Sequence, residues 1–181
     1  MQKSVFVILS FFISAGILAN SALNEPIRPI PLTIELDERK VSLGNDLFHD
    51  KRLSHDNTIS CSSCHDLQKG GTDQQQYSLG INSSLGGINS PTVFNSAFNF
   101  RQFWNGRAET LEQQAEGPVH NPIEMGSNWE EVISKLKNDG FYPELFKEIY
   151  GKDGIKPKSI VDAIATFERS LYTPNSRFDQ Y

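Results

Sequence analysis

Two cysteines and a histidine stand close together in the run Cys61-Ser62-Ser63-Cys64-His65, and the 181-residue chain has no other cysteine. On a helix, residues three and four positions apart share a face, so both thiols and the imidazole would point the same way. Covalent attachment of a c-type haem needs this pattern, because two thioethers hold the porphyrin and the adjacent histidine binds the iron. We therefore expect haem c on Cys61 and Cys64, with His65 as the proximal iron ligand.

Other chemistry of paired cysteines fits this chain less well. A thioredoxin-like redox pair would be expected in a strand–helix–strand context, which the surrounding residues do not show. A structural zinc site would need a second pair of ligands. A disulfide across two intervening residues would be strained. Haem attachment is therefore the favoured interpretation of the motif.

The first 22 residues have the features of a secretory signal peptide. Lys3 precedes an apolar run over residues 5–19, and small residues lead up to Ala22. The run is shorter than the ~20 residues that span the hydrocarbon core of a membrane, so a cleaved signal is favoured over an anchor. Since c-type haem is attached outside the cytoplasm, we expect the mature protein in the periplasm, without a membrane segment.

The composition limits both the partners and the core. The formal net charge is -5, which argues against a basic nucleic-acid-binding domain. Only 38% of the residues are hydrophobic, and the signal peptide holds many of them. A mature chain this polar has either much loop or an apolar group that is not protein in its core, and a buried haem would supply one.

The elements that must position these residues are short helices joined by long loops, since no strand pattern of useful length occurs. We expect an all-α fold, with an extended strap over 23–39 and a glycine-rich loop over 66–90. The predicted helices cover 37–49, 61–65, 92–98, 111–116, 128–137, 143–150 and 157–171. Capping patterns at Thr110 and Ser127, and prolines at 91 and 157, mark several of the starts.

The sixth iron position decides between two functions. A second strong protein ligand would make an electron-transfer cytochrome, whereas an open side would allow a small molecule to react. Met125 is the one methionine besides Met1, and the remaining histidines are His49, His55 and His120. From the residues alone, a His65/Met125 electron carrier and a haem with an open side both stay in play.

An ordered series of further motifs runs through residues 40–181. In chain order they are the run from Leu43 to Asp66, Gly70-Gly71-x-Asp73, Asn89-Ser90-Pro91-Thr92-Val93-x-Asn95, Gln102-Phe103-Trp104-x-Gly106-Arg107-Ala108, Leu111-Glu112-x-Gln114-Ala115-x-Gly117-Pro118, Asn121-Pro122-x-Glu124-Met125 and Arg177-Phe178-Asp179-Gln180-Tyr181. The series resembles the bacterial di-haem cytochrome c peroxidases, a family that also includes the methylamine-utilisation haem enzymes.

This resemblance implies that residues 40–181 are the cytochrome c-like, peroxide-reacting domain of such an enzyme. Glu124 would be the acid–base that moves a proton between the oxygens of hydrogen peroxide, and Gln114 would hydrogen-bond the bound peroxide. Trp104 would lie on the electron route from a second haem, and Asn89 would help to bind a calcium ion between domains. In this family the methionine beside the glutamate is not a ligand of this iron.

Two departures from the family pattern carry expectations of their own. Many members place a histidine on the oxidised peroxidatic iron, but Ile81 occupies the matching position, so we expect a resting iron that is five-coordinate or water-bound. Members also have a second Cys-x-x-Cys-His domain, which the 181 residues do not contain, so we expect a fragment rather than a one-haem remnant. The resemblance implies a small cytochrome c or cupredoxin as electron donor; it also admits a homodimer and, as another activity, oxidation of a protein partner.

Overall fold

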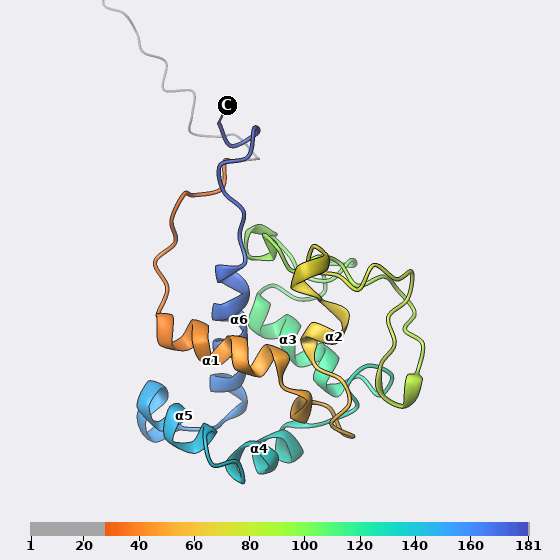
Figure 1. Ribbon diagram of the computed structural model, residues 1–181, viewed down its shortest axis with the longest axis vertical. Helices are drawn as coiled ribbons and strands as arrows, with labels where there is room; N and C mark the ends of the chain where they lie inside the picture. Colours follow the sequence, from red (N-terminus) through yellow and green to blue (C-terminus); the bar gives the residue numbers. More distant parts are fainter. Residues whose placement is uncertain (1–27, 181) are drawn as a thin grey trace, which may run out of the picture.

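The computed structural model describes residues 28–180, and within this range the chain is helical, without a β-strand (Figure 1). Its α-helices are α1 (Glu38–His49), α2 (Cys61–Cys64), α3 (Leu111–His120), α4 (Trp129–Lys137), α5 (Tyr142–Tyr150) and α6 (Pro157–Ser170). The expected all-α class is thereby confirmed. The expected signal peptide and the first residues of the strap lie outside the described range.

Helices α1 and α6 cross at the centre of the molecule (Figure 1). Leu43 and Leu47 of α1 and Ile164 of α6 are fully or almost fully buried where the two helices meet. Gly44 stands at the contact, and a β-carbon there would collide with the carbonyl oxygen of Ala163. The missing side chain therefore lets the two backbones approach closely, which fixes the frame for the rest of the fold.

Helices α4 and α5 extend the same core, through Val132, Leu136 and Phe146. A polar network connects the start of α5 to the residues that follow α1. The Asp50 carboxylate accepts hydrogen bonds from Arg52 and from the hydroxyl of Tyr142, and Arg52 also donates to Asp139 at 2.6 Å. The network bridges residues 50–52 and the start of α5.

Helix α3 continues past the predicted stop at Gly117-Pro118 and ends at His120. Proline normally ends a helix because it lacks an N–H and its ring clashes with the preceding turn. Here the following turn folds back and supplies donors: the N–H groups of Met125 and Ser127 bond to the carbonyls of Pro118 and Val119. These bonds satisfy the last turn of α3, so the prediction of an earlier end was wrong.

The predicted helix over 92–98 was also wrong, since only Ser96–Phe98 forms a single 3-10 turn. Ser90 does not cap a helix; its hydroxyl bonds to that of Ser78, across the glycine-rich loop. The start of α4 differs by one residue, because Asn128 rather than Ser127 accepts the capping bond from Glu131. The starts of α1 and α6 agree with prediction to within a residue.

The remaining long segments lie along the helices. The described part of the strap runs in extended form beside the C-terminal segment, where the Ile30 N–H donates to the Asp179 carboxylate at 2.9 Å. Residues 66–90 form the expected loop, which contains the 3-10 turns Leu67–Lys69 and Ile81–Ser83. Within residues 28–180, no helix is both long and apolar enough to span a lipid bilayer.

Candidate functional site

The paired cysteines lie on the one-turn helix α2. Ser60 precedes it, and the Ser63 hydroxyl accepts a bond from the Ser60 N–H, which closes the start of the turn. His65 is the residue after the helix, and its N–H bonds to the carbonyl of Cys61 at 2.9 Å. The expected helix through His65 thus ends one residue early, but Cys61, Cys64 and His65 all line the same cavity.

The His65 ring is oriented by the loop that follows it. Its Nδ1 lies 3.3 Å from the carbonyl oxygen of Gly71, to which it can only donate. A proton on Nδ1 leaves the lone pair on Nε2, the atom that can bind a metal. Burial lowers the pKa of His65, which keeps the ring in the neutral form needed of an iron ligand.

The two cysteines form no disulfide with each other, and the pKa values of both thiols are raised. Burial raises the pKa of Cys61 to about 12, and burial also raises that of Cys64. A thiol with a raised pKa carries little thiolate at neutral pH, and thiolate is the reactive form in redox pairs and zinc sites. The environment therefore disfavours both of those alternatives, while it leaves the thiols facing a cavity.

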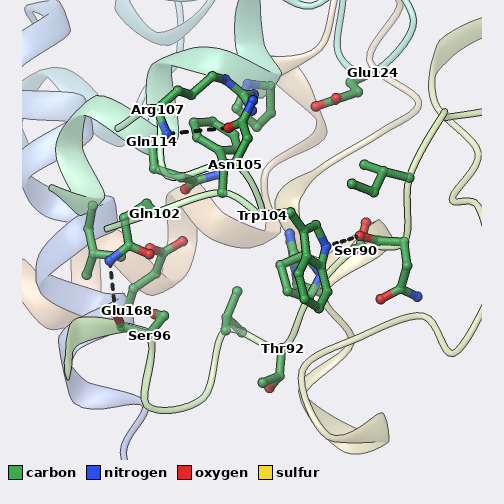
Figure 2. A pocket seen from close by; sticks show the side chains of 18 residues that line it. Ser90, Thr92, Ser96, Gln102, Trp104, Asn105, Arg107, Gln114, Glu124 and Glu168 are labelled. Atoms are coloured by element: carbon green, nitrogen blue, oxygen red, sulfur yellow. Dashed lines mark hydrogen bonds between the residues drawn. The ribbon is translucent and has the colours of Figure 1, made fainter. Parts of the chain in front are cut away.

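Two adjoining cavities meet at His65. The cysteine cavity is lined by the two cysteines and mainly apolar groups, among them Ile59, Ala115, Val119 and Ile164. The Trp104 cavity is lined by more polar residues, among them Ser96, Gln102, Asn105 and Arg107 (Figure 2). Both are lined by His65, Ile88, Ser90, Gln114, Pro118, Glu124 and Glu168.

This lining fits haem c. The macrocycle needs apolar walls near the cysteines and polar partners for its two propionates. The cysteine cavity offers the apolar walls, and the Trp104 cavity offers the polar partners. One of these partners is the buried hydroxyl of Ser96, which has no hydrogen-bond partner in the described structure. Cys61, Cys64 and His65 are the residues that would hold the group.

Glu124 lies in the turn after α3 and lines both cavities. The Asn121 side-chain amide donates to Glu124 Oε1 at 2.7 Å. Burial raises the pKa of Glu124 above 4.5, against the opposing effects of the Asn121 bond and the Arg107 charge. A half-buried carboxyl with a raised pKa holds a proton more readily than an exposed one, which suits proton exchange with a bound substrate.

The glycine-rich loop holds the backbone at Glu124. The Ile81 N–H donates to the carbonyl of Glu124 at 2.9 Å. Gly80 packs directly on that carbonyl and on the carbonyl of Ile123, so any side chain at position 80 would collide. Ile81 is buried against Gly126 and lines neither cavity. The position that matches the family's distal histidine thus serves as a packing contact here.

Gln114 of α3 lines both cavities, as does Pro118 one turn later. Met125 also lines the cysteine cavity and is only 3% exposed. Each of the other three histidines contacts groups elsewhere: His49 bonds to Asn45, His55 pairs with Glu131 and His120 packs on Trp129. Met125 is therefore the alternative iron ligand that the described residues place at the site.

Trp104 is 64% exposed and lines the mouth of the Trp104 cavity. Its indole N–H donates to the backbone carbonyl of Asn89 at 2.9 Å, and the Asn89 side chain donates to the carbonyl of Gln75. Among the described residues, no cluster of three acidic, histidine or cysteine side chains forms a ready-made metal site. The calcium role of Asn89 stays a prediction.

Two residues at the cavities had no predicted role. Arg107 lies over the Phe103 ring, with Cζ 3.3 Å from the ring centroid, and its charge acts on Glu124. Glu168 of α6 is 5% exposed and lines both cavities. A signal for Glu168 was present, because it stands four residues after the buried Ile164 on one face of a helix.

Comparison with known proteins agrees with this geometry. The family model of the di-haem cytochrome c peroxidases matches residues 38–181. The chain is 52% identical over 159 residues to cytochrome c peroxidase Ccp of Escherichia coli, covering 87% of this chain and 34% of that protein. It is 44% identical over 172 residues to cytochrome c551 peroxidase of Nitrosomonas europaea, covering 95% of this chain and 51% of that protein.

A solved structure gives the same picture. The fold matches a MauG-like protein associated with microbial copper homeostasis with a TM-score of 0.75 and 33% identity, over 86% of this chain and 47% of that one. The chain thus spans about half the length of these relatives, or less. With the paired cysteines, His65 and Glu124 gathered at the joined cavities, the chain belongs to the di-haem cytochrome c peroxidase family.

Proposed function

We propose that this chain is the peroxide-reacting haem domain of an enzyme that reduces hydrogen peroxide to water. The observation that carries the proposal is the placement of Glu124 and Gln114 on the walls of the cavities that Cys61, Cys64 and His65 line. The relatives named as cytochrome c peroxidases support the same activity. The overall reaction takes one peroxide, two electrons and two protons to two waters.

Haem c, when bound, supplies the iron at which peroxide binds and the path for the electrons. Cys61 and Cys64 would hold it through thioethers, and His65 would bind the iron through Nε2, since Nδ1 faces Gly71. Glu124 takes a proton from one peroxide oxygen and delivers it to the other, which leaves as water. Because Oε1 accepts from Asn121, we assign proton transfer to Oε2. Gln114 orients the peroxide through its side-chain amide.

The electrons come from outside residues 28–180. Exposed Trp104 at the mouth of the cavity suits an entry point, and a second haem domain of a longer protein is the expected source. A small cytochrome c or cupredoxin in the periplasm would feed that domain. The family resemblance also assigns Asn89, whose backbone carbonyl accepts from the Trp104 indole, to a calcium ion that would order this entry point.

Replacement of Glu124 tests the proposal. In the full-length haem-loaded enzyme, Glu124→Gln keeps the size of the side chain but removes its exchangeable proton. We expect steady-state peroxide reduction to fall by about 10²–10⁴-fold, the usual contribution of an acid–base group. Glu130→Gln, on the exposed start of α4, is the matched control and should keep full activity. An equal rate in Glu124→Gln and the control would overturn the assignment.

Met125 lines the cysteine cavity and is buried, which favours a second candidate function, that of a His65/Met125 electron-transfer cytochrome. Methionine ligation would produce a low-spin ferric spectrum with a sulfur-to-iron charge-transfer band, which Met125→Leu would abolish. The peroxidase proposal expects no such band and normal haem spectra in Met125→Leu. The family resemblance also admits a third activity, oxidation of a protein partner. Reaction with peroxide without consumption of small electron donors would favour it.

A further inference from the structure

Three buried polar side chains gather at one end of the Trp104 cavity. Ser96 and Gln102 are each 7% exposed, and Glu168 is 5% exposed. Figure 2 shows them together at the end of the pocket away from Glu124. They come from a 3-10 turn, a loop and α6, so three separate segments build this polar recess.

The polar recess is not satisfied by the protein itself. Ser96 Oγ is buried without any hydrogen-bond partner in the described structure. The Glu168 carboxyl forms no hydrogen bond with the described residues. Gln102 Nε2 donates to the Ser96 carbonyl at 2.9 Å, which fixes its amide. Buried polar groups are rarely left unpaired, so the Ser96 hydroxyl, with the Glu168 carboxyl on the wall of the same cavity, points to a polar ligand atom that is absent from the chain.

The charges around the recess favour donors over acceptors. Burial raises the pKa of Glu168 to about 8, against the opposing charge of Arg169, and Glu112 adds to the rise. At neutral pH the carboxyl is therefore mostly protonated and can donate a hydrogen bond. The Ser96 hydroxyl can donate as well. Two donors facing one recess suit an anionic oxygen ligand.

The attachment chemistry fixes which part of haem c faces the recess. Thioethers form at the vinyl positions, and the two propionates stand on the other half of the macrocycle. Cys61 and Cys64 line only the cysteine cavity, whereas Ser96 and Gln102 line only the Trp104 cavity. We propose that the Ser96–Gln102–Glu168 recess seats one haem propionate, with Ser96 and Glu168 as hydrogen-bond donors to it.

This inference rests on haem attachment and does not require peroxide reduction, so the two can fail separately. Loss of the donors would leave the propionate with its full negative charge near the iron, which stabilises the ferric state. We therefore expect Glu168→Leu to lower the haem reduction potential and to shift the propionate bending band in the resonance Raman spectrum. Ser96→Ala should shift both in the same direction, by less.

Two further variants separate loss of a hydrogen-bond donor from other effects of substitution. Glu168→Gln retains a donor in a side chain of the same size, so it should keep a propionate band close to that of the parent protein. Ser134→Ala, on the polar side of α4, is the control for the serine change and should alter nothing. All variants are compared as haem-loaded full-length protein, with haem content measured per polypeptide.

An unchanged band and potential in Glu168→Gln fit the proposal, provided that Ser96→Ala and Glu168→Leu both shift them. If Glu168→Leu also leaves them unchanged, the recess holds solvent and the proposal is wrong. If Glu168→Leu fails to fold, a Raman band of Ser96→Ala identical to the parent's overturns the proposal on its own. A changed Ser96→Ala band together with full peroxidase loss in Glu124→Gln would support both assignments.

Discussion

The proposed chemistry depends on the carboxyl of Glu124, whose proton affinity is set by its neighbours. Burial raises the pKa of Glu124, while the amide of Asn121 and the charge of Arg107 act in the opposite direction. In the proposed reaction, Glu124 must be ionised to accept the first proton from peroxide. The rate should therefore rise with pH through a midpoint above 4.5, the ordinary pKa of a glutamate.

Removal of the Arg107 charge tests this balance. Arg107→Leu takes away a cation that lowers the pKa of Glu124, so the acid limb of the pH–rate profile should move to higher pH. Arg101→Leu is the matched control, since Arg101 pairs with Glu109 at 2.8 Å and lines neither cavity. A profile for Arg107→Leu that coincides with the control would show that this guanidinium does not act on Glu124.

At the scale of elements, the α1–α6 crossing holds α2 and the cavities in place. Gly44→Ala would push a β-carbon into the carbonyl oxygen of Ala163 and into Phe167. Overpacking of this kind typically costs about 1–3 kcal/mol. We expect the free energy of unfolding, measured by urea titration, to decrease by an amount within that range.

Gly87→Ala provides the control, because a β-carbon at that loop position meets no atom within 4 Å. Equal stability of Gly44→Ala and Gly87→Ala would contradict the account of the helix crossing.

The Asp50 network makes the stability of the fold depend on pH. Burial raises the pKa of Asp50, but hydrogen bonds from Arg52 and Tyr142 outweigh this effect, so the pKa lies below 3.8. The group then stabilises the fold above its ordinary pKa, and this contribution is lost as pH falls through the lowered value.

Asp50→Asn should therefore lower the free energy of unfolding by about 2–3 kcal/mol at pH 7, since it breaks a largely buried charged network. The difference from the parent should shrink near pH 3 in urea titrations. Asp46→Asn, one turn earlier on α1, lacks these partners and should change stability little. A pH-independent loss in Asp50→Asn would argue against the ionic origin of the effect.

Sequence patterns predicted the helices with apolar faces well. The stripe from Ile160 to Phe167 and the proline at 157 place α6 correctly, because local periodicity and capping determine such helices. The end of α3 was missed, because its last carbonyls are satisfied by the turn over 121–127, a contact formed only in the tertiary fold. The prediction of a helix over 92–98 was wrong for a similar reason, because the Ser90 hydroxyl bonds to that of Ser78 and does not cap a helix.

At the scale of the whole molecule, the site was predicted in part. The Cys61–His65 motif and the family resemblance named the residues that the fold brings to the cavities, including Gln114 and Glu124. Glu168 and Ser96 carried no motif, since their burial depends on the long-range approach of α6 to the loop at 96–102. The helical spacing from Ile164 marks Glu168 as facing the core, but its grouping with Ser96 depends on the meeting of distant segments.

The chain exposes apolar side chains on the wall of the Trp104 cavity. Trp104 is 64% exposed and Ile88 is 60% exposed. Because the curated relatives are about twice as long or longer, this surface is the natural place for the electron inlet proposed above. Figure 2 shows the Glu124 side chain apart from that of Trp104, so the proposed proton transfer and the proposed inlet involve different parts of the cavity wall.

The proposed haem has a peroxide side that is open at rest and is served by Glu124. The most direct test mixes fully oxidised, haem-loaded protein with hydrogen peroxide, without prior reduction, and follows the haem spectrum by stopped flow. Because Ile81 lies against Gly126 and lines neither cavity, we predict a high-spin ferric spectrum and an immediate reaction that Glu124→Gln slows at least about 10²-fold. A low-spin ferric spectrum with no reaction until the protein is reduced would contradict the account.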